Sequence, residues 1–512
     1  MLVKTYGSAV AGIDATTITI EVNLGQGINF FMVGLPDSAV KESQQRIDAA
    51  LKNNGYKIPG KGITINMAPA DIRKEGSAYD LPIAVGILAA AGDVTPEELG
   101  AYIVMGELSL DGSLNPIKGV LPIAIQARKE KYKGIILPRY NATEAAVVEG
   151  LEVYGADNIM DVIAHLNGEK SMEQTVVDTR QEFYSQLINV EHNFSEVKGQ
   201  ENIKRALEIA AAGGHNAILI GPPGAGKTML AKRLPTILPP LNLHEALETT
   251  KIHSVAGKMG KGASLISARP FRSPHHTISD VALVGGGSFP QPGEISLAHN
   301  GVLFLDELPE FQRTVLEVMR QPMEERTVTI SRAKMTVDYP ASFMLIASMN
   351  PCPCGYYNHP DKDCVCAPGV VQRYLNKISG PLLDRIDIHI EVTPVPFEAL
   401  SGTRPAEPSD AIRVRVEEAR GIQEERFADV EGVYCNAQMS TKALRNLCAI
   451  DAGGLTLLRT AMDRLGLSAR AYDRILKVAR TIADLDNSAD IKNKHLAEAI
   501  QYRSLDRESW AG

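Results

Sequence analysis

The clearest chemical pattern in this sequence is the segment AILIGPPGAGKTML, residues 217–230. An apolar run leads into a loop with the spacing Gly221-x-x-x-x-Gly226-Lys227-Thr228. Glycines in such a loop let backbone N–H groups turn inward around phosphates, the lysine places a positive charge near the β and γ oxygens, and the threonine hydroxyl is a ligand for Mg²⁺. The predicted ATP-binding residues are Gly221, Pro222, Pro223, Gly224, Ala225, Gly226, Lys227 and Thr228.

Two later apolar runs end in polar residues that suit phosphoryl transfer. The segment GVLFLDEL delivers Asp306 and Glu307, and the segment SFMLIASMN ends in Asn350. We expect Asp306 to hold Mg²⁺ through water, Glu307 to polarise the attacking water, and Asn350 to orient that water against the γ-phosphate. An Asp-Glu pair after an apolar run is a common pattern by itself. Together with the glycine-rich loop it predicts ATP hydrolysis.

Four of the six cysteines lie close together directly behind Asn350. The pattern is Cys352-x-Cys354, then nine residues, then Cys364-x-Cys366. Two close pairs of thiolates predict a tetrahedral structural Zn²⁺ site, although the usual spacing within a pair is C-x₂-C. His359 is a spare ligand candidate. Free thiols and a redox switch are the alternatives.

A basic stretch separates Lys227 from Asp306. Residues 249–279 contain no Asp or Glu, although the whole chain has a formal net charge of −8. A positive, glycine-containing loop would grip phosphates without reading bases. The alternative is a solvated insertion whose charges pair with acidic residues elsewhere. The DNA-binding candidates in this stretch are Lys258, Lys261, Arg269 and Arg272.

A second DNA-binding candidate is the segment ERTVTISRAKMTVDYPASF, residues 325–343. Its two alternating runs flank the residues SRAK, which predicts a β-hairpin that precedes the Asn350 strand. Arg332 and Lys334 would lie at the tip of this hairpin.

The patterns that position these residues divide the chain of 512 residues into four parts. Residues 1–167 mix short strands with amphipathic helices, and the polar residues 168–193 are typical of a linker. Residues 194–395 alternate buried strands with helices, which predicts a parallel α/β sheet. Residues 396–512 have the apolar spacing of helices, with Ser440 and Ser468 as expected N-caps.

Composition limits the classes of function. The net charge of −8 and a sequence pI near 5.8 exclude a uniformly basic nucleic-acid coat, so any DNA contact must come from local patches. No secretion signal is visible, and the longest apolar stretch falls short of the ~20 residues of a membrane helix. We therefore expect a cytoplasmic protein that does not contact membranes, in which clustered cysteines bind metal more often than they form disulfides.

The sequence resembles the AAA+ ATPases, and more closely the magnesium-chelatase-like branch that contains the ComM/YifB proteins. The resemblance covers nearly the whole chain, from VAGIDATTITIEVNLGQGINFFMVGLPD and NMAPADIRKEGSAYDLPIA through FRSPHHTISDVALVGGG to LSARAYDRILKVARTIADL. It implies an α/β fold: an AAA+ P-loop core with an N-terminal Lon-protease-like α+β domain and a C-terminal helical lid.

The resemblance also implies roles for residues outside the P-loop. The segment SEVKGQENIKRALEIAAAGGHN is similar to the part that lies over the adenine. The residues implied there are Val197, Gly199 and Gln200. Arg385 is implied as an arginine finger that reaches the ATP of a neighbouring subunit, with Arg373 as the alternative. Arg470 resembles the sensor arginine of the lid. A surface salt bridge is the alternative role for Arg385 and for Arg470. A finger acting in trans implies a homo-oligomeric ring, and the resemblance implies a hexamer.

Four functions are compatible with these features. The resemblance favours a ring motor that moves DNA, as in branch migration during recombination or uptake of transforming DNA. A chelatase-type motor that drives metal insertion through a partner subunit is the second, and an ATP-gated interaction protein the third. A Lon-like protease would need a Ser-Lys dyad, but Ser77 is one residue early and Lys118 is three residues displaced from the positions implied for the dyad.

Overall fold

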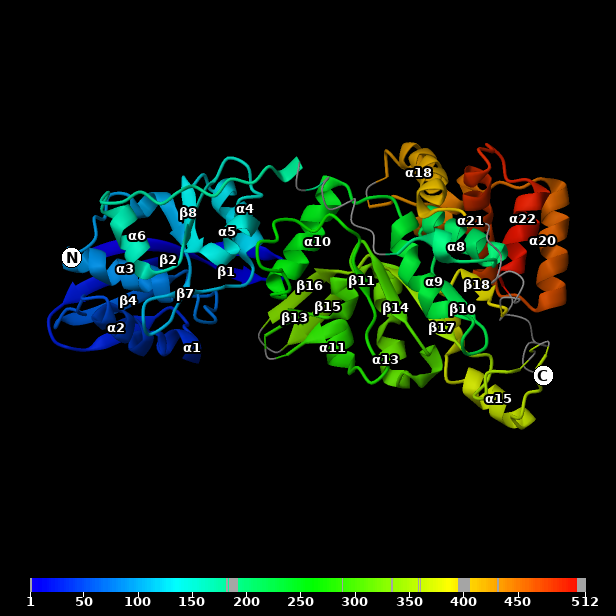
Figure 1. Cartoon of the computed structure of the whole chain (residues 1–512), viewed down its shortest axis with the longest axis horizontal. Coiled ribbons are helices and arrows are strands. Elements are labelled where there is room, and N and C mark those ends of the chain that lie inside the picture. The colour runs from blue at the N-terminus through cyan, green and yellow to red at the C-terminus, as the bar shows by residue number, and fades with distance from the viewer. Residues whose placement is uncertain are drawn as a thin grey trace.

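The computed structural model describes residues 2–180, 183, 192–287, 289–332, 335–357, 359, 361–394, 406–430 and 432–503. The molecule is elongated, with the N-terminal sheet at one end, a parallel sheet in the middle and a group of helices at the other end (Figure 1). Separate apolar cores fill the N-terminal part and the central and C-terminal parts. The division into domains that the sequence suggests stays a prediction.

A seven-stranded sheet organises the N-terminal part, in the order β3-β4-β2-β1-β5-β8-β9. Neighbours β4, β2 and β1 pair antiparallel, and the other neighbouring strands pair parallel. The strands are β1 (Leu2–Ala11), β2 (Asp14–Gly25), β3 (Phe30–Val33), β4 (Gly62–Ala68), β5 (Tyr102–Val104), β8 (Gly134–Pro138) and β9 (Glu152–Ala156). The helices are α1 (Ser38–Lys41), α2 (Ser43–Asn53), α3 (Asp80–Ala91), α4 (Val120–Lys129), α5 (Arg139–Ala145) and α6 (Ile159–Leu166), and a short hairpin joins β6 (Glu107–Leu108) to β7 (Leu114–Asn115).

Helix α3 contains the longest apolar run of the sequence and is buried on all sides against β1 and β2. A helix that is apolar all round needs such cover on every face. Among the described residues, no helix is long and apolar enough to cross a membrane.

A five-stranded parallel sheet, in the order β11-β14-β17-β10-β18, forms the centre of the molecule. This confirms the predicted parallel α/β fold. The strands are β10 (Ala217–Ile220), β11 (Phe271–Arg272), β14 (Val302–Leu305), β17 (Met344–Met349) and β18 (Ile388–Glu391). The larger helices around it are α8 (Glu201–Gly213), α9 (Lys227–Arg233), α10 (Leu243–Val255), α13 (Arg313–Val318), α14 (Arg320–Glu325) and α15 (Pro368–Leu375).

The predicted hairpin before the Asn350 strand is present. Strands β15 (Thr327–Arg332) and β16 (Met335–Pro340) pair antiparallel, and the last pair joins Arg332 to Met335. Lys334, predicted at the tip of this hairpin, lies outside the described residues.

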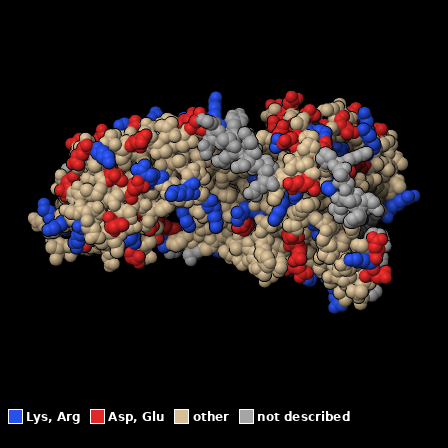
Figure 2. All heavy atoms as spheres, in the orientation of Figure 1, with Lys and Arg blue, Asp and Glu red and all other residues tan. Residues whose placement is uncertain are grey.

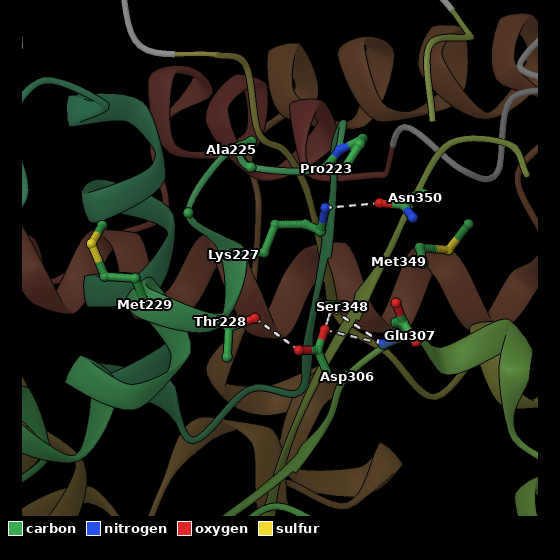
Figure 3. A pocket seen from close by; sticks show the side chains of 12 residues that line it. Pro223, Ala225, Lys227, Thr228, Met229, Asp306, Glu307, Ser348, Met349 and Asn350 are labelled. Atoms are coloured by element: carbon green, nitrogen blue, oxygen red, sulfur yellow. Dashed lines mark hydrogen bonds between the residues drawn. The ribbon is translucent and has the colours of Figure 1, made fainter. Parts of the chain in front are cut away.

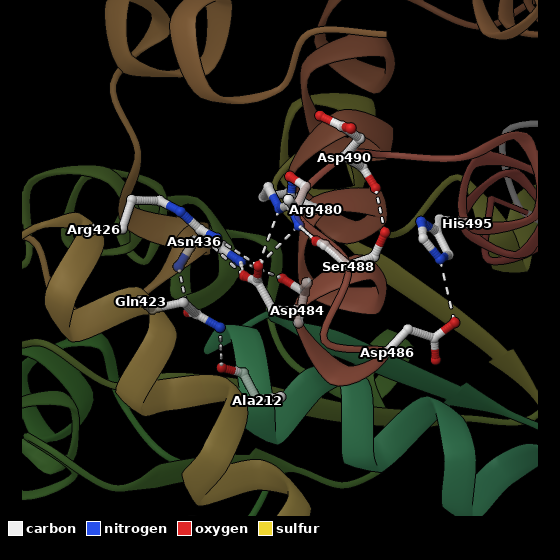
Figure 4. Close-up of polar contacts among 12 residues, drawn as sticks. Ala212, Gln423, Arg426, Asn436, Arg480, Asp484, Asp486, Ser488, Asp490 and His495 are labelled. Atoms are coloured by element: carbon white, nitrogen blue, oxygen red, sulfur yellow. Dashed lines mark hydrogen bonds and ion pairs between the residues drawn. The ribbon is translucent and has the colours of Figure 1, made fainter. Parts of the chain in front are cut away.

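Helices form the C-terminal part, as the apolar spacing predicts: α18 (Ser409–Arg426), α19 (Thr441–Leu447), α20 (Ala452–Leu465), α21 (Ala469–Leu485) and α22 (Asn493–Gln501). Ser440 and Ser468 cap α19 and α21 through their side chains, as expected. The buried Asp484 carboxylate receives hydrogen bonds from Arg426, Asn436 and Arg480 (Figure 4). This network joins α18, α21 and the intervening turn.

The N-terminal part is attached to the central part through the end of α10. The Gly119 N–H donates to the Ser254 carbonyl at 3.1 Å, and the Ser254 hydroxyl donates to the Glu144 carboxylate. Burial raises the pKa of Glu144. The β1–β2 turn also lies close to β16, because a Cβ on Gly12 would come within 2.9 Å of Val337.

Candidate nucleotide site

Three neighbouring parallel strands bring the predicted ATP-binding residues to one edge of the central sheet. Strand β10 runs into the glycine-rich loop and α9, β14 is followed by Asp306, and β17 is followed by Asn350. The carboxyl ends of parallel strands meet at one sheet edge, which is where such folds bind ligands. A pocket of about 430 Å³ lies there, shown in Figure 3. Its lining residues are Pro223, Gly224, Ala225, Gly226, Lys227, Thr228, Met229, Asp306, Glu307, Ser348, Met349 and Asn350.

The Lys227 ammonium group bridges the glycine-rich loop and the Asn350 strand. Its Nζ atom donates to the carbonyls of Gly221 at 2.7 Å and Pro222 at 3.0 Å, and to Asn350 Oδ1 at 3.0 Å. Burial lowers the pKa of Lys227, and the negative charge of Asp306 opposes that shift. A buried ammonium that makes these bonds is placed to exchange them for phosphate oxygens.

Thr228 and Asp306 form the part of the pocket that suits Mg²⁺. The Thr228 hydroxyl donates to Asp306 Oδ2 at 2.7 Å, and the Ser348 hydroxyl donates to Asp306 Oδ1. A hydroxyl beside a carboxylate is the oxygen donor set that Mg²⁺ takes in nucleotide sites, so these residues fit that ion. The sequence patterns did not predict Ser348 as a site residue. Its only signal is a hydroxyl within an otherwise apolar run.

Glu307 has a left-handed backbone, with φ of +55°. Its N–H donates to Asp306 Oδ1 at 3.1 Å, and this contact stabilises the turn at the end of β14. The Glu307 carboxylate is 57% exposed and lies 3.8 Å from the Nδ1 atom of His276. No sequence pattern indicates this contact, because His276 lies in the basic stretch, far from Glu307 along the chain.

None of the three residues predicted to lie over the adenine, Val197, Gly199 and Gln200, lines the pocket, but Gln200 contacts the glycine-rich loop. The Gln200 side-chain amide donates to the carbonyls of Ala225 at 3.1 Å and Thr393 at 3.2 Å. Val197 is buried, and neither Val197 nor Gly199 belongs to the lining of the pocket. Gln200 therefore joins the glycine-rich loop to the segment after β18.

The three predicted arginines lie outside the pocket of their own chain. Arg385 is buried and pairs with Glu324 at 2.6 Å, whereas Arg373 is exposed and donates to the Gly369 carbonyl at 3.0 Å. Arg470 is 60% exposed and lies 3.5 Å from Asp384, the residue before Arg385. Arg470 thus lies near the residue that precedes Arg385, and neither arginine lines the pocket of its own chain.

The four clustered cysteines converge in space. Their sulfur atoms all lie within 4.8 Å of one another. The distances from Cys352 Sγ are 3.3 Å to Cys354 and 3.7 Å to Cys364, and Cys354 lies 3.5 Å from Cys364. His359 does not belong to this group among the described residues. Cys435 and Cys448 are buried apart from it.

The DNA-binding candidates fall into two groups. Lys258, Lys261 and Arg332 are exposed. By contrast, Arg272 forms a bidentate ion pair with Glu294 at 2.6 and 2.7 Å. Arg269 donates to the Asn300 carbonyl at 2.7 Å and forms an ion pair with Glu245. Both guanidinium groups are thus paired with carboxylates of the same chain, although the Arg272 side chain is still 32% exposed. Figure 2 shows Lys and Arg gathered on one face over the middle of the molecule, around α10 and the hairpin.

The contacts in the N-terminal part do not form a Ser-Lys dyad. The Ser77 hydroxyl donates to the Glu107 carboxylate. The Lys118 side chain lies against Gly257 in the central part, where a Cβ would meet its Cε at 2.8 Å. A nucleophile and its base must lie within hydrogen-bond reach, so this arrangement disfavours proteolysis.

The fold and the pocket define a P-loop ATPase of the AAA+ magnesium-chelatase-like class. Residues 193–400 match the family described as "Magnesium chelatase, subunit ChlI", residues 20–141 match "Subunit ChlI of Mg-chelatase", and residues 406–503 match the ChlI C-terminal family. Proteins of this class use ATP with Mg²⁺ and generally form oligomers.

Relatives extend the match to almost the full chain. Competence protein ComM of Haemophilus influenzae is 44% identical over 98% of this chain and 97% of its own length. Protein YifB of Escherichia coli is 44% identical over 98% of this chain and 96% of its own. The chain belongs to the ComM/YifB-type magnesium-chelatase-like family. A shorter match is to the DNA replication licensing factor mcm7 of Schizosaccharomyces pombe. This match is 27% identical and covers 38% of this chain and 23% of the mcm7 protein.

Proposed function

We propose that the protein is an ATP-hydrolysing ring motor that acts on DNA as a branch-migration helicase in recombination or natural transformation. The observation that carries the enzymatic part is the meeting of Lys227, Thr228, Asp306 and Asn350 in one pocket. The DNA part is supported by the names of two relatives, a competence protein and a replication licensing factor. A cytoplasmic location belongs to the same proposal.

Each pocket residue has a separate part in hydrolysis. Lys227 would bind the β and γ oxygens, and Thr228 with Asp306 would hold Mg²⁺, which would supply positive charge to the phosphates. Glu307 polarises the attacking water, and Asn350 orients it. Because Lys227 bonds to Asn350, the residue proposed to bind phosphate and the residue proposed to orient water are in direct contact.

A ring, hexameric in this proposal, explains why the candidate arginines lie away from their own pocket. Arg385 follows Asp384, which lies 3.5 Å from Arg470, and from there Arg385 would reach the γ-phosphate of a neighbouring subunit. Arg470 would act as the sensor arginine of the lid. Arg385 must exchange Glu324 for that phosphate on assembly. Its Nε atom is buried and has no hydrogen-bond partner among the described residues, so the guanidinium group must move before it can reach that phosphate.

The DNA path is assigned to the exposed cations near the hairpin. Lys258 and Lys261 follow α10, and Arg332 ends β15. Exposed Lys and Arg side chains bind phosphates without sequence preference. Arg269 and Arg272, which are paired with carboxylates, would shape this region and contribute less to DNA affinity.

A structural Zn²⁺ ion completes the proposal. Tetrahedral zinc with Zn–S bonds of about 2.3 Å separates its sulfur ligands by roughly 3.8 Å. The sulfur–sulfur distances of 3.3, 3.5 and 3.7 Å are at or somewhat below that separation, so a bound ion would move the sulfurs slightly apart. The donor set consists of Cys352, Cys354, Cys364 and Cys366.

The second candidate function is a chelatase-type motor, which the three family descriptions favour. One assay with purified protein separates the two functions: a Holliday-junction substrate and a forked DNA, each with and without ATP, with Lys227→Ala as the control. ATP-dependent rearrangement of strands that is abolished in Lys227→Ala supports the DNA motor. ATP turnover that is indifferent to DNA, together with no DNA binding, contradicts it.

A further inference from the structure

The loop that carries the four cysteines lies against the nucleotide pocket. It starts directly after Asn350, whose side chain contacts Lys227. Gly355, one residue after Cys354, has φ of +85°, and a Cβ at this position would lie 2.5 Å from the Cδ atom of Pro223. Pro223 lines the pocket. The cysteine loop therefore touches the P-loop from outside.

The C-terminal end of the cysteine loop also leads back to Asn350. Helix α15 begins at Pro368, two residues after Cys366. Burial raises the pKa of Tyr374 in this helix, and the backbone of Asn350, which lies beside its hydroxyl, acts to lower that pKa. Arg373, the alternative arginine finger, is the neighbour of Tyr374. The loop thus joins the residue that orients water to the helix that carries a candidate finger.

Apart from the cysteines, the described part of this loop has no regular secondary structure to hold it in place. The described residues between Met349 and Pro368 include neither a helix nor a strand. Cys352 is buried, whereas the other three thiols are partly exposed. A metal ion that joins the two Cys pairs would replace the missing secondary structure, because metal-binding free energy is then available to hold the fold.

We propose that Zn²⁺ bound by the four thiolates holds this loop against Pro223 and Asn350, so that zinc occupancy sets the affinity of the pocket for ATP. The inference rests on the proposed ATP and zinc sites, and goes beyond them by making the metal a determinant of nucleotide binding. Zinc takes no part in the chemistry of hydrolysis. It fixes the position of residues that contact the nucleotide.

The first experiment removes and returns zinc in the unaltered protein. Protein purified without chelator should contain about one equivalent of zinc per chain, and its affinity for a fluorescent ATP analogue is measured by titration. A zinc-selective chelator should weaken binding at least fivefold, the lower end of typical coupling between two sites, and added Zn²⁺ should restore it. Less than about half an equivalent of zinc overturns the metal site.

The second experiment uses matched cysteine variants. Cys364→Ser should lose zinc and bind the ATP analogue at least about fivefold more weakly, whereas Cys448→Ser, which changes a buried cysteine outside the cluster, should keep both. Circular dichroism of each variant reports whether the chain stays folded. Loss of zinc with unchanged ATP affinity overturns the coupling. Wild-type protein with zinc that does not bind the analogue overturns the proposed ATPase instead, so the two failures are distinct.

The third experiment tests the contact with all four thiols intact. Gly355→Ala forces a methyl group toward Pro223, so it should keep zinc but weaken ATP binding. Gly432→Ala is the matched control, because Gly432 has a similar φ of +75° and its added methyl group would meet no atom within 4 Å. Equal ATP affinity in the two variants contradicts the proposed route from the loop to the pocket.

Discussion

The Lys227 ammonium group and the Asn350 side-chain oxygen lie 3.0 Å apart, and this bond joins two strands that are distant in the sequence. Lys227 opens α9, which follows β10, and Asn350 follows β17. The register that aligns Ile220 with Met349 brings them together. A single hydrogen bond therefore links the residue proposed to bind phosphate with the residue proposed to orient water.

We expect Asn350→Ala to separate hydrolysis from binding. Loss of the amide removes the group that orients water, which should lower kcat by about 10²-fold or more, since positioned groups that assist proton transfer contribute at least that much. Affinity for ATP should change little, because Lys227 keeps its bonds to the carbonyls of Gly221 and Pro222. Single-turnover hydrolysis and titration with a fluorescent ATP analogue measure the two effects.

Lys227→Ala is the control for this prediction, because it should abolish binding itself. An Asn350→Ala variant that loses affinity as completely as Lys227→Ala would show that Asn350 holds the P-loop in shape and does not act on water.

The pocket residues that the sequence predicts are those that belong to a recognisable pattern with their neighbours along the chain. Lys227 and Thr228 belong to a contiguous loop, and Asp306 and Asn350 each end an apolar strand. Parallel pairing then brings them together, which the alternation of strands and helices predicts. Ser348 was missed because a hydroxyl inside a strand has no distinct spacing.

Contacts between distant segments had no signal in the sequence. Gly355 meets Pro223, and Ser254 bonds to Glu144, only because loops pack in a particular way. The sequence also predicts DNA contacts for both Arg269 and Lys258, because both residues are basic and lie in the same stretch. The structure separates them, because Arg269 bonds to Asn300 and Glu245 inside the fold. Charge along the chain indicates a basic stretch, and only packing decides which charges reach the surface.

The exposed cations near the hairpin should determine how DNA affinity responds to salt. Removing one cation that binds a phosphate lowers the slope of log affinity against log salt by about 0.7 to 1, so the variant Lys258→Ala, Lys261→Ala, Arg332→Ala should lower it by roughly two to three. Fluorescence anisotropy with single-stranded DNA over a range of salt concentrations measures this slope.

The matched control is the double variant Lys442→Ala, Arg445→Ala, which removes exposed cations from α19. It should leave the slope near that of the unaltered protein. A triple variant with the wild-type slope would place the DNA path elsewhere.

Arg385→Ala should lower ATP turnover in the assembled protein by about 10³-fold, the contribution of an arginine finger, without loss of ATP affinity. The isolated chain should also become less stable, because Glu324 loses its partner at 2.6 Å. Turnover is measured on the oligomeric fraction after size-exclusion chromatography, so that failed assembly is not mistaken for slow hydrolysis.

Arg373→Ala provides the comparison for Arg385→Ala. Arg373 is exposed and has no carboxylate partner among the described residues, so its removal should not affect folding. If turnover falls about 10³-fold in Arg373→Ala and only a few-fold in Arg385→Ala, the finger is Arg373.

The buried Asp484 carboxylate should be essential for the stability of the C-terminal helices. Its side chain is fully buried, and Arg426 and Arg480 donate to it at 2.8 and 3.1 Å. Asp484→Asn leaves two guanidinium groups without a counter-charge, and breaking a buried pair in this way costs about 3–5 kcal/mol. Because the chain has several cores, the change is best measured as the opening free energy of α21 by amide hydrogen exchange. Asp490→Asn, the same change on an exposed side chain, should have little effect, and similar exchange in the two variants would mean that Asp484 is not the centre of the network.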